Sequence, residues 1–373
     1  MRYTMTQLSN EFQHKLSQCL CPPGNGVFTV NTAKERKEAL HLALFGQIDN
    51  ITPLWQQSLA ELPHSSNAVM LGIASDCGGG ILRGANWGPL FLRSTLHENY
   101  AALKFHDLGD IRVIPHLLHD KYLNEATIAN CRKALYQNEH SEYPVSPLSI
   151  TENVLHDFYA TFPNKGIFGI GGDHSVSYPL TKAYLQAKKK QGKRAAIIHF
   201  DAHTDLLVER LGIDLCFGSW CTHILDDLHE HNHLIQIGIR SSGKPKSHWE
   251  STFGVKQHWA KDIIVHGVEP MIAEILTQLN TEQIDELYVS FDIDAIDAKF
   301  ASATGTPEPD GLTPEHAMTI LTRLAEHYPI TGADMMEIAP FTDSTGAGAN
   351  SAHTTLAVAA EISAYLLAQM AKQ

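Results

Sequence analysis

Residues 199–206 read His-Phe-Asp-Ala-His-Thr-Asp-Leu, and the rest of the chain is organised around them. The apolar run at residues 195–198 just before this stretch follows a lysine and an arginine, which predicts a buried strand. Side chains alternate between two faces along such a strand and the extended residues that leave it, so Asp201, His203 and Asp205 should project the same way. Burying two carboxylates and an imidazole together without a partner would be costly. The stretch therefore predicts a bound metal ion; the alternative, a solvated acidic turn, is disfavoured by the apolar residues on both sides.

Two other stretches place the same kinds of side chain just past a strand. Residues 169–175 read Gly-Ile-Gly-Gly-Asp-His-Ser, so a glycine-rich turn delivers His174 past a second strand. Residues 287–291 form a third strand pattern, which leads into Asp292 and Asp294 on one face. Six ligands with carboxylates able to bridge predict two ions, held by His174, Asp201, His203, Asp205, Asp292 and Asp294. Carboxylates with a minority of imidazoles suit Mn²⁺ first, with Ni²⁺ or Fe²⁺ as alternatives, and the lack of thiolate ligands counts against structural zinc.

On these motifs the chain resembles the ureohydrolase family, which includes arginases and agmatinases. The shared motifs are Gly-Gly-Asp-His-Ser at 171–175, Asp-Ala-His-Thr-Asp at 201–205 and Ser-Phe-Asp-Ile-Asp-Ala-Ile-Asp at 290–297, followed by Ala-Thr-Gly-Thr-Pro at 303–307. The similarity covers roughly residues 67–370. It implies an α/β, three-layer αβα arginase-like fold with a central, mainly parallel sheet. The alternation of strand and helix patterns predicts the same kind of sheet, with ligands gathered outside the carboxyl ends of its strands.

The chain divides into an N-terminal helical extension, residues 1–66, and a catalytic domain, residues 67–373. In the extension, Leu8, Phe12, Leu16 and Leu20 recur at helical spacing. An apolar stripe of this kind needs a covering surface, either the chain's own core or a neighbouring subunit. We expect it to pack on a neighbouring subunit of a homo-oligomer, because the family that the chain resembles assembles as trimers or hexamers. In the catalytic domain, Ile-Ile-Val at residues 263–265 predicts a short strand.

The composition bounds the partners and the compartment. The formal net charge of −13 argues against nucleic acid and favours cationic ligands. The N-terminus lacks the apolar core of a signal peptide, and no apolar run is long enough to span a bilayer. The six cysteines show neither paired zinc spacing nor a small disulfide framework. We therefore expect a cytoplasmic protein with no membrane partner.

Three residues are candidates for the chemistry. Two divalent ions within about 4 Å of each other would make water acidic enough to supply hydroxide near neutral pH. Asp205 is placed to bridge the ions and take the water's proton, a role that the resemblance also implies. His223 is the candidate that protonates the departing nitrogen; the alternative is a histidine packed beside Trp220. Glu337 follows the last strand among apolar residues. Its carboxylate can bind a guanidinium through two parallel hydrogen bonds, a role that the resemblance also implies, because the corresponding glutamate of the family acts in this way. The alternative is a structural salt bridge to an arginine.

These features predict a dinuclear metal hydrolase that cleaves a guanidino compound to urea plus an amine or ammonia. The arginases it resembles follow the second motif with an Asn and, later, Ser-Gly-Asn-x-His, which hold the α-carboxylate of arginine; here Leu-Leu-Val-Glu-Arg stands at residues 206–210. The His-Gly loop of agmatinases is lacking too, and Trp220 within a longer loop could narrow the pocket. We therefore favour guanidine or another small guanidino substrate, as in the nickel-dependent guanidine hydrolases with comparable N-terminal extensions. The alternatives are agmatinase, guanidinobutyrase or arginase activity, or a non-catalytic subunit that keeps the fold. The resemblance also places a loop that ends with Arg93 over the mouth of the site.

Overall fold

The computed structural model describes residues 9–27, 29, 31–80, 82–342 and 350–373. Within them lies one nine-stranded sheet whose neighbouring strands are parallel, except at β1, which pairs antiparallel with β3. Along the sheet the order is β1 (Leu20–Cys21), β3 (His106–Ile111), β2 (Ala68–Ile73), β4 (Gly166–Gly171), β9 (Ile330–Met336), β8 (Glu286–Asp292), β5 (Ala195–Phe200), β6 (Leu234–Ile239) and β7 (Lys256–Trp259). The predicted mainly parallel sheet is confirmed.

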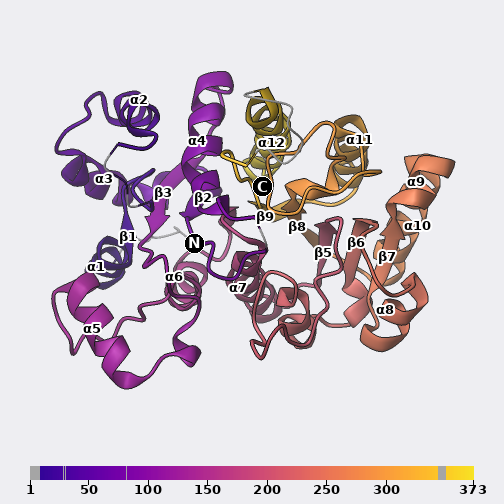
Figure 1. Ribbon diagram of the computed structural model, residues 1–373, viewed down its shortest axis with the longest axis horizontal. Coiled ribbons are helices and arrows are strands. Elements are labelled where there is room, and N and C mark those ends of the chain that lie inside the picture. The colour runs from indigo at the N-terminus through magenta and orange to yellow at the C-terminus, as the bar shows by residue number, and fades with distance from the viewer. Residues whose placement is uncertain (1–8, 28, 30, 81, 343–349) are drawn as a thin grey trace, which may run out of the picture.

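Helices cover both faces of this sheet, which gives the predicted three-layer architecture (Figure 1). The helices are α1 (Asn10–Cys19), α2 (Lys34–Phe45), α3 (Ile51–Leu59), α4 (Gly88–Asn99), α5 (Glu125–Tyr136), α6 (Pro147–Thr161), α7 (Ser177–Lys190), α8 (Lys246–Phe253), α9 (Ala260–His266), α10 (Val268–Thr281), α11 (Pro314–Ala325) and α12 (Asn350–Met370). In Figure 1, α4, α11 and α12 lie on one side of the sheet and α6 and α7 on the other. No helix among the described residues is long and apolar enough to cross a membrane.

Alternation along the strands sends side chains into two separate cores. On β5, Ala196, Ile198 and Phe200 pack in the core that includes residues of α10, α11 and α12. Ala195 and Ile197 pack in the other core, with residues of α1, α6 and α7. His199 and Asp201, which continue the second series, therefore belong to the α6/α7 face of the sheet.

The N-terminal extension folds against its own chain, which contradicts the expectation that its apolar stripe packs on a neighbouring subunit. Phe12, Leu16 and Leu20 are at most 5% exposed within the monomer, and the ring centroid of Phe12 lies 6.4 Å from that of Phe162, which follows α6. Leu8 lies outside the described residues. The periodicity revealed an apolar face but not which surface covers it. Since β1 pairs with β3, the extension also continues the central sheet.

The strand predicted at residues 263–265 is wrong. These residues belong to helix α9, in which Ile263 is buried while Ile264 and Val265 are largely exposed. Three apolar residues fit a helix and a strand equally well when no periodicity extends beyond them. The strand at this edge of the sheet is instead β7, whose sequence Lys-Gln-His-Trp carries little apolar pattern.

Candidate metal centre

The three predicted motifs meet because their strands are parallel and close together. In the sheet, β4, β8 and β5 end at the same edge, and only β9 lies between β4 and β8. Each strand is followed at once by a tight turn or a short 3-10 helix, such as η4 (His174–Val176) after β4 and η8 (Ile293–Ala295) after β8. Asp173 and Asp292 cap these 3-10 helices by accepting hydrogen bonds from backbone amides two residues ahead. The caps fix the backbone where the functional side chains leave the sheet.

All six predicted ligands come together in two groups. In the first, Nδ1 of His174 lies 3.1 Å from Asp201 Oδ2, 3.2 Å from Asp205 Oδ2 and 3.1 Å from Asp292 Oδ2. In the second, Nδ1 of His203 lies 3.3 Å from Asp201 Oδ1 and 3.2 Å from Asp294 Oδ2. Asp201 is the carboxylate that the two groups share, with one oxygen in each. Asp205 belongs to the first group only, so Asp201, and not Asp205, would be the carboxylate in reach of both ions.

The His174 ring is prepared for a metal ion. Its Nε2 lies 3.1 Å from Ser290 Oγ, and Ser290 donates its own proton to Asp334 at 2.9 Å. Ser290 therefore accepts from Nε2–H, which leaves the lone pair of the ring on Nδ1. That nitrogen is buried, makes no hydrogen bond to any described residue and faces three carboxylate oxygens. An unpartnered nitrogen among carboxylates, oriented through its other nitrogen, is the donor set that a divalent cation requires.

The electrostatics of the cluster point to the same conclusion. Burial raises the pKa of Asp292 well above its usual range, and the charges of Asp294 and Asp201 add to the rise. Burial also acts to raise the pKa of Asp201, but the adjacent rings of His174, His199 and His203 outweigh it and hold that pKa well below its usual value. Four crowded carboxylates cannot all ionise cheaply without positive charge between them. Divalent cations supply that charge, so the residues present fit two metal ions.

The cluster is almost closed to solvent. The side chain of His203 is 24% exposed, whereas those of the other five ligands are at most 4% exposed. Nε2 of His203 lies 3.5 Å from Oε1 of Glu308, whose side chain is also partly exposed. His203 is therefore the candidate ligand most accessible to solvent.

Asp205 and Glu337 hold strained backbone conformations. Their φ angles are +49° and +63°, in the left-handed region that residues other than glycine seldom adopt. Such strain costs about 1–3 kcal/mol per residue and persists where the surrounding structure imposes it. Oε1 of Glu337 accepts a hydrogen bond from the backbone amide of His174 at 2.9 Å, which ties the carboxylate to the first metal-ligand group. Two of the three residues predicted to carry out the chemistry, Asp205 and Glu337, therefore lie in or beside the cluster and have a strained backbone.

The structure does not bring His223 to the cluster. Its Nε2 lies 3.0 Å from the carbonyl oxygen of Asp214, and its ring packs against Tyr178 with centroids 5.6 Å apart. Arg93 is also elsewhere: it is fully buried in ion pairs with Asp107 and Asp110, so it does not cover the mouth of the site. In both cases the side chain is held by a charged or polar partner that lies elsewhere in the chain, outside the motif on which the prediction was based.

Three further residues contact the cluster and were missed by the sequence analysis. Trp220 donates from Nε1 to Asp205 Oδ2 at 2.8 Å, Thr306 donates to Asp294 Oδ2 at 2.8 Å, and His199 lies 2.9 Å from Asp201 Oδ2 through its Nε2. His199 could have been found, because it shares the strand face of Asp201. Thr306 lies in the Ala-Thr-Gly-Thr-Pro motif. Trp220 carried no signal of this contact, since it depends on how the loop at residues 206–224 folds back.

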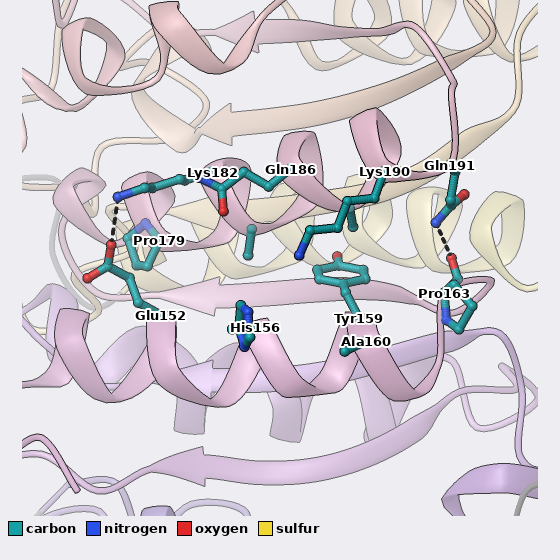
Figure 2. Close-up of a pocket in the computed structure, with 12 residues that line it drawn as sticks. Glu152, His156, Tyr159, Ala160, Pro163, Pro179, Lys182, Gln186, Lys190 and Gln191 are labelled. Atoms are coloured by element: carbon teal, nitrogen blue, oxygen red, sulfur yellow. Dashed lines mark hydrogen bonds and ion pairs between the residues drawn. The ribbon is translucent and has the colours of Figure 1, made fainter. Parts of the chain in front are cut away.

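A separate cavity of about 320 Å³ lies between α6 and α7 (Figure 2). Across it, Nζ of Lys182 lies 3.1 Å from Oε1 of Glu152, and the side chain of Tyr159 points from α6 toward α7. None of the residues that line it is a predicted metal ligand, so it is distinct from the metal centre.

Known proteins are similar to this chain in sequence and in fold. The sequence model of the arginase family matches residues 66–368. The mitochondrial guanidino acid hydrolase of Homo sapiens is 29% identical over 300 residues, which cover 76% of this chain and 74% of that protein. The guanidinobutyrase of Pseudomonas aeruginosa is 28% identical over 297 residues, or 78% of this chain and 84% of its own. Among solved structures, the proclavaminate amidino hydrolase of Streptomyces clavuligerus has a TM-score of 0.62 and 26% identity, over 83% of this chain and 93% of that chain.

Proposed function

The chain belongs to the arginase family of hydrolases, which act on guanidino carbon–nitrogen bonds, and we propose that it is a dinuclear metal-dependent ureohydrolase for guanidine or another small guanidino compound. The products are urea and ammonia from guanidine, or urea and an amine from a substituted guanidine. The two ions are held by His174, Asp201, Asp205 and Asp292 on one side and by His203, Asp201 and Asp294 on the other. We take Mn²⁺ first and Ni²⁺ as the alternative, because the donors are carboxylates and imidazoles.

The observation that carries the proposal is the environment of Glu337. Its carboxylate is buried, with Oε1 fixed by the His174 amide. Among the described residues, Oε2 makes neither a hydrogen bond nor an ion pair with an arginine, which argues against the structural salt bridge. A Cβ on Gly305 would lie only 3.1 Å from Oε2, so the glycine keeps this oxygen approachable. A buried carboxylate with a free oxygen beside a metal cluster suits a planar cation such as a guanidinium.

The residues of the chain then divide the work. Bound divalent ions would lower the pKa of water enough to supply a nucleophile near neutral pH. Asp205 takes the proton of the attacking water, with its Oδ2 held by Trp220. Because His223 is directed toward Asp214, we assign the return of that proton to the departing nitrogen to Asp205 as well. Glu337 orients the guanidinium carbon toward the cluster.

The closed mouth supports a small substrate. The loop at residues 206–224 is joined to the loop after β2 by a backbone hydrogen bond from Phe217 to Gly78 at 3.0 Å. A Cβ on Gly80 would lie 3.7 Å from the Phe217 ring and 3.4 Å from Thr306, which itself binds the ligand Asp294. Phe217 thus lies near the metal centre, which leaves little room for a long substrate tail.

A short guanidino acid is the second candidate. The guanidinium of Arg210 lies over the Phe217 ring, 4.9 Å from its centroid, and makes no ion pair in the described part of the chain. A free cation near the mouth could bind the carboxylate of such a substrate, as the names of the human and Pseudomonas relatives suggest for their own substrates. Replacing Arg210 by alanine should then lower activity on 4-guanidinobutyrate and leave activity on guanidine unchanged.

A third possibility, a non-catalytic subunit, should have lost metal ligands, whereas all six are present and lie in ion-pair contact with one another. We keep two further proposals from the sequence: a cytoplasmic location, with which six free cysteines agree, and a homo-oligomer. Exposed apolar residues of the loop, such as Val208 at 71% and Leu211 at 96%, offer a surface for subunit contact.

One assay panel tests the proposal. Urea release is measured with guanidine, agmatine, 4-guanidinobutyrate and arginine, each with Mn²⁺ and with Ni²⁺, and metal analysis counts the ions per chain. We expect two ions and the highest kcat/KM on guanidine. One ion per chain, or no urea from any guanidino compound with either metal, would contradict the proposal.

A further inference from the structure

A row of polar side chains crosses the sheet beneath the metal centre. Gln257 on β7, Gln236 on β6 and His199 on β5 are direct neighbours in the strand registers. All three are fully buried, and they lie among the apolar residues of the α6/α7 face. Burying uncharged polar groups brings little net stability even when their hydrogen bonds are made, and apolar residues of similar shape would serve the core as well. The stability of the fold therefore does not explain why these three polar residues are buried side by side.

The hydrogen bonds along this row run in one direction. The indole N–H of Trp259 can only donate, and it donates to Gln257 Oε1 at 2.9 Å. The Gln257 amide group must then donate from Nε2 to Gln236 Oε1, at 2.8 Å. Gln236 in turn presents Nε2 to His199 Nδ1 at 2.9 Å, and also donates to the carbonyl of Thr204 at 2.6 Å. A donor-only group at the start thus fixes the orientation of both amides.

The direction of the row determines the tautomer of His199. Because Nδ1 accepts from Gln236, the ring proton of a neutral His199 is on Nε2. That proton points at Asp201 Oδ2, 2.9 Å away. A histidine that donates through Nε2 has no lone pair there for a metal ion, so His199 acts on the carboxylate rather than as a ligand. Asp201 is the carboxylate shared by the two ligand groups.

We propose that His199, Gln236 and Gln257 are positioning residues that hold Asp201 in the orientation needed to bind both metal ions. The inference rests on the proposed dinuclear centre. A fixed donor on one carboxylate oxygen leaves the remaining lone pairs of Asp201 aimed at the ions. Partners of this kind typically change metal affinity by about 10- to 100-fold when they are removed.

The test measures metal binding to protein stripped of metal, by titration with Mn²⁺ in competition with a chelator. His199→Leu removes the donor, and we expect Mn²⁺ to bind about 10- to 100-fold more weakly. His199→Gln keeps an N–H group near the position of Nε2 and should restore most of that loss. Gln236→Leu keeps the imidazole but frees its tautomer, so we expect a smaller loss, of about three- to tenfold. Thr151→Val, which removes a buried hydroxyl on α6 bonded to the carbonyl of Pro147, is the matched control and should bind Mn²⁺ as wild type does.

The outcomes separate the possible explanations. A merely structural row would shift the thermal unfolding of the metal-free variants and leave the Mn²⁺ dissociation constant unchanged, which would overturn the inference. It would also be overturned if His199→Gln bound Mn²⁺ as weakly as His199→Leu, since the donor would then not be the property that matters. If His199→Leu fails to fold, the Mn²⁺ dissociation constant of Gln236→Leu alone decides between a structural row and positioning residues. Failure of the wild-type protein to bind two ions would instead contradict the proposed metal centre.

Discussion

The strand ends of β4, β5 and β8 and the contact of helix α1 with α6 are both largely buried, but they contain opposite kinds of side chain. The strand ends bury four carboxylates and an unpartnered histidine nitrogen, in strained backbone at Asp205. The helix contact buries Phe12 and Leu16 against Phe162 and its neighbours, and its ion pair, Lys15 with Asp157 at 2.6 Å, reaches a partly exposed carboxylate. Burial of apolar area stabilises a fold, whereas burial of crowded charge costs stability and is retained for chemistry. Changes in the two regions should therefore have opposite effects.

The largest effect is expected from Asp205→Asn. The substitution removes the proton acceptor while keeping the shape, and asparagine tolerates the positive φ at this position. We expect kcat on the best substrate to fall by about 10⁴-fold, roughly 5 kcal/mol, as for the loss of a general base. Thermal unfolding of the metal-free protein should be unchanged or slightly improved. Wild-type turnover in this variant would refute the role of Asp205.

The converse change is Leu16→Ala in α1. Leu16 is fully buried, so its truncation should lower the free energy of unfolding by about 2–5 kcal/mol. Denaturant unfolding measures the loss, and kcat/KM per folded molecule should stay at the wild-type value. The exposed Leu42 on α2, changed to alanine, is the control and should shift stability by no more than about 0.5 kcal/mol. An unchanged stability for Leu16→Ala would mean that the extension is held some other way.

Within the metal centre, Glu337→Gln separates substrate binding from metal binding. The glutamine keeps a carbonyl to accept from the His174 amide but loses the charge that faces Gly305. Losing a charge-assisted hydrogen bond to the guanidinium should lower kcat/KM by about 2–3 kcal/mol, roughly 30- to 150-fold. Two metal ions should still bind. A loss of metal in this variant would assign Glu337 to the cluster instead of the substrate.

A smaller effect is expected from Trp220→Phe, which removes the N–H donated to Asp205 together with part of the buried indole ring. An ionised acceptor left short of one buried partner should cost about 1.4 kcal/mol, a tenfold drop in kcat. The pH dependence of kcat should shift as well, because the hydrogen bond favours the ionised carboxylate. Trp249→Phe, whose indole donates to Ser242 and not to a candidate metal ligand, is the control and should leave the pH profile unchanged.

The same contrast explains how much could be predicted from the sequence. The grouping of the six candidate ligands could be predicted because a spacing of two residues on a strand places side chains on one face whatever surrounds them. The three motifs then met because parallel strands end at one edge. The position of His223 could not be predicted, since it depends on the carbonyl of Asp214 and the ring of Tyr178. Likewise, the burial of Arg93 depends on Asp107 and Asp110 of β3, and the cover of α1 on Phe162. The sequence predicted the local geometry of side chains along a strand, but it did not predict which of several possible partners a side chain would contact.

Substrate choice depends both on a residue whose position a strand fixes and on a loop whose contacts the sequence does not predict. Glu337 directly follows a strand, whereas the loop at residues 206–224 has no such regular geometry. Glu337 is the proposed binding site for the guanidinium, but the loop carries Leu206, Leu207 and Val208 where arginases anchor an α-carboxylate. In the structure Leu206 is buried in the apolar core, so it offers no polar group to the carboxylate of an arginine tail. A charged tail buried without partners is penalised beyond the loss of a contact. We therefore expect guanidine first, and a short guanidino-amine or -acid second, to exceed arginine in kcat/KM by at least about tenfold, or roughly 1.4 kcal/mol. The comparison uses the same metal-loaded protein for every substrate, so metal content cancels. If arginine is the best substrate with either metal, the proposed effect of the loop is wrong, while the roles of Asp205 and Glu337 would stand, because they concern the guanidinium that all these substrates share.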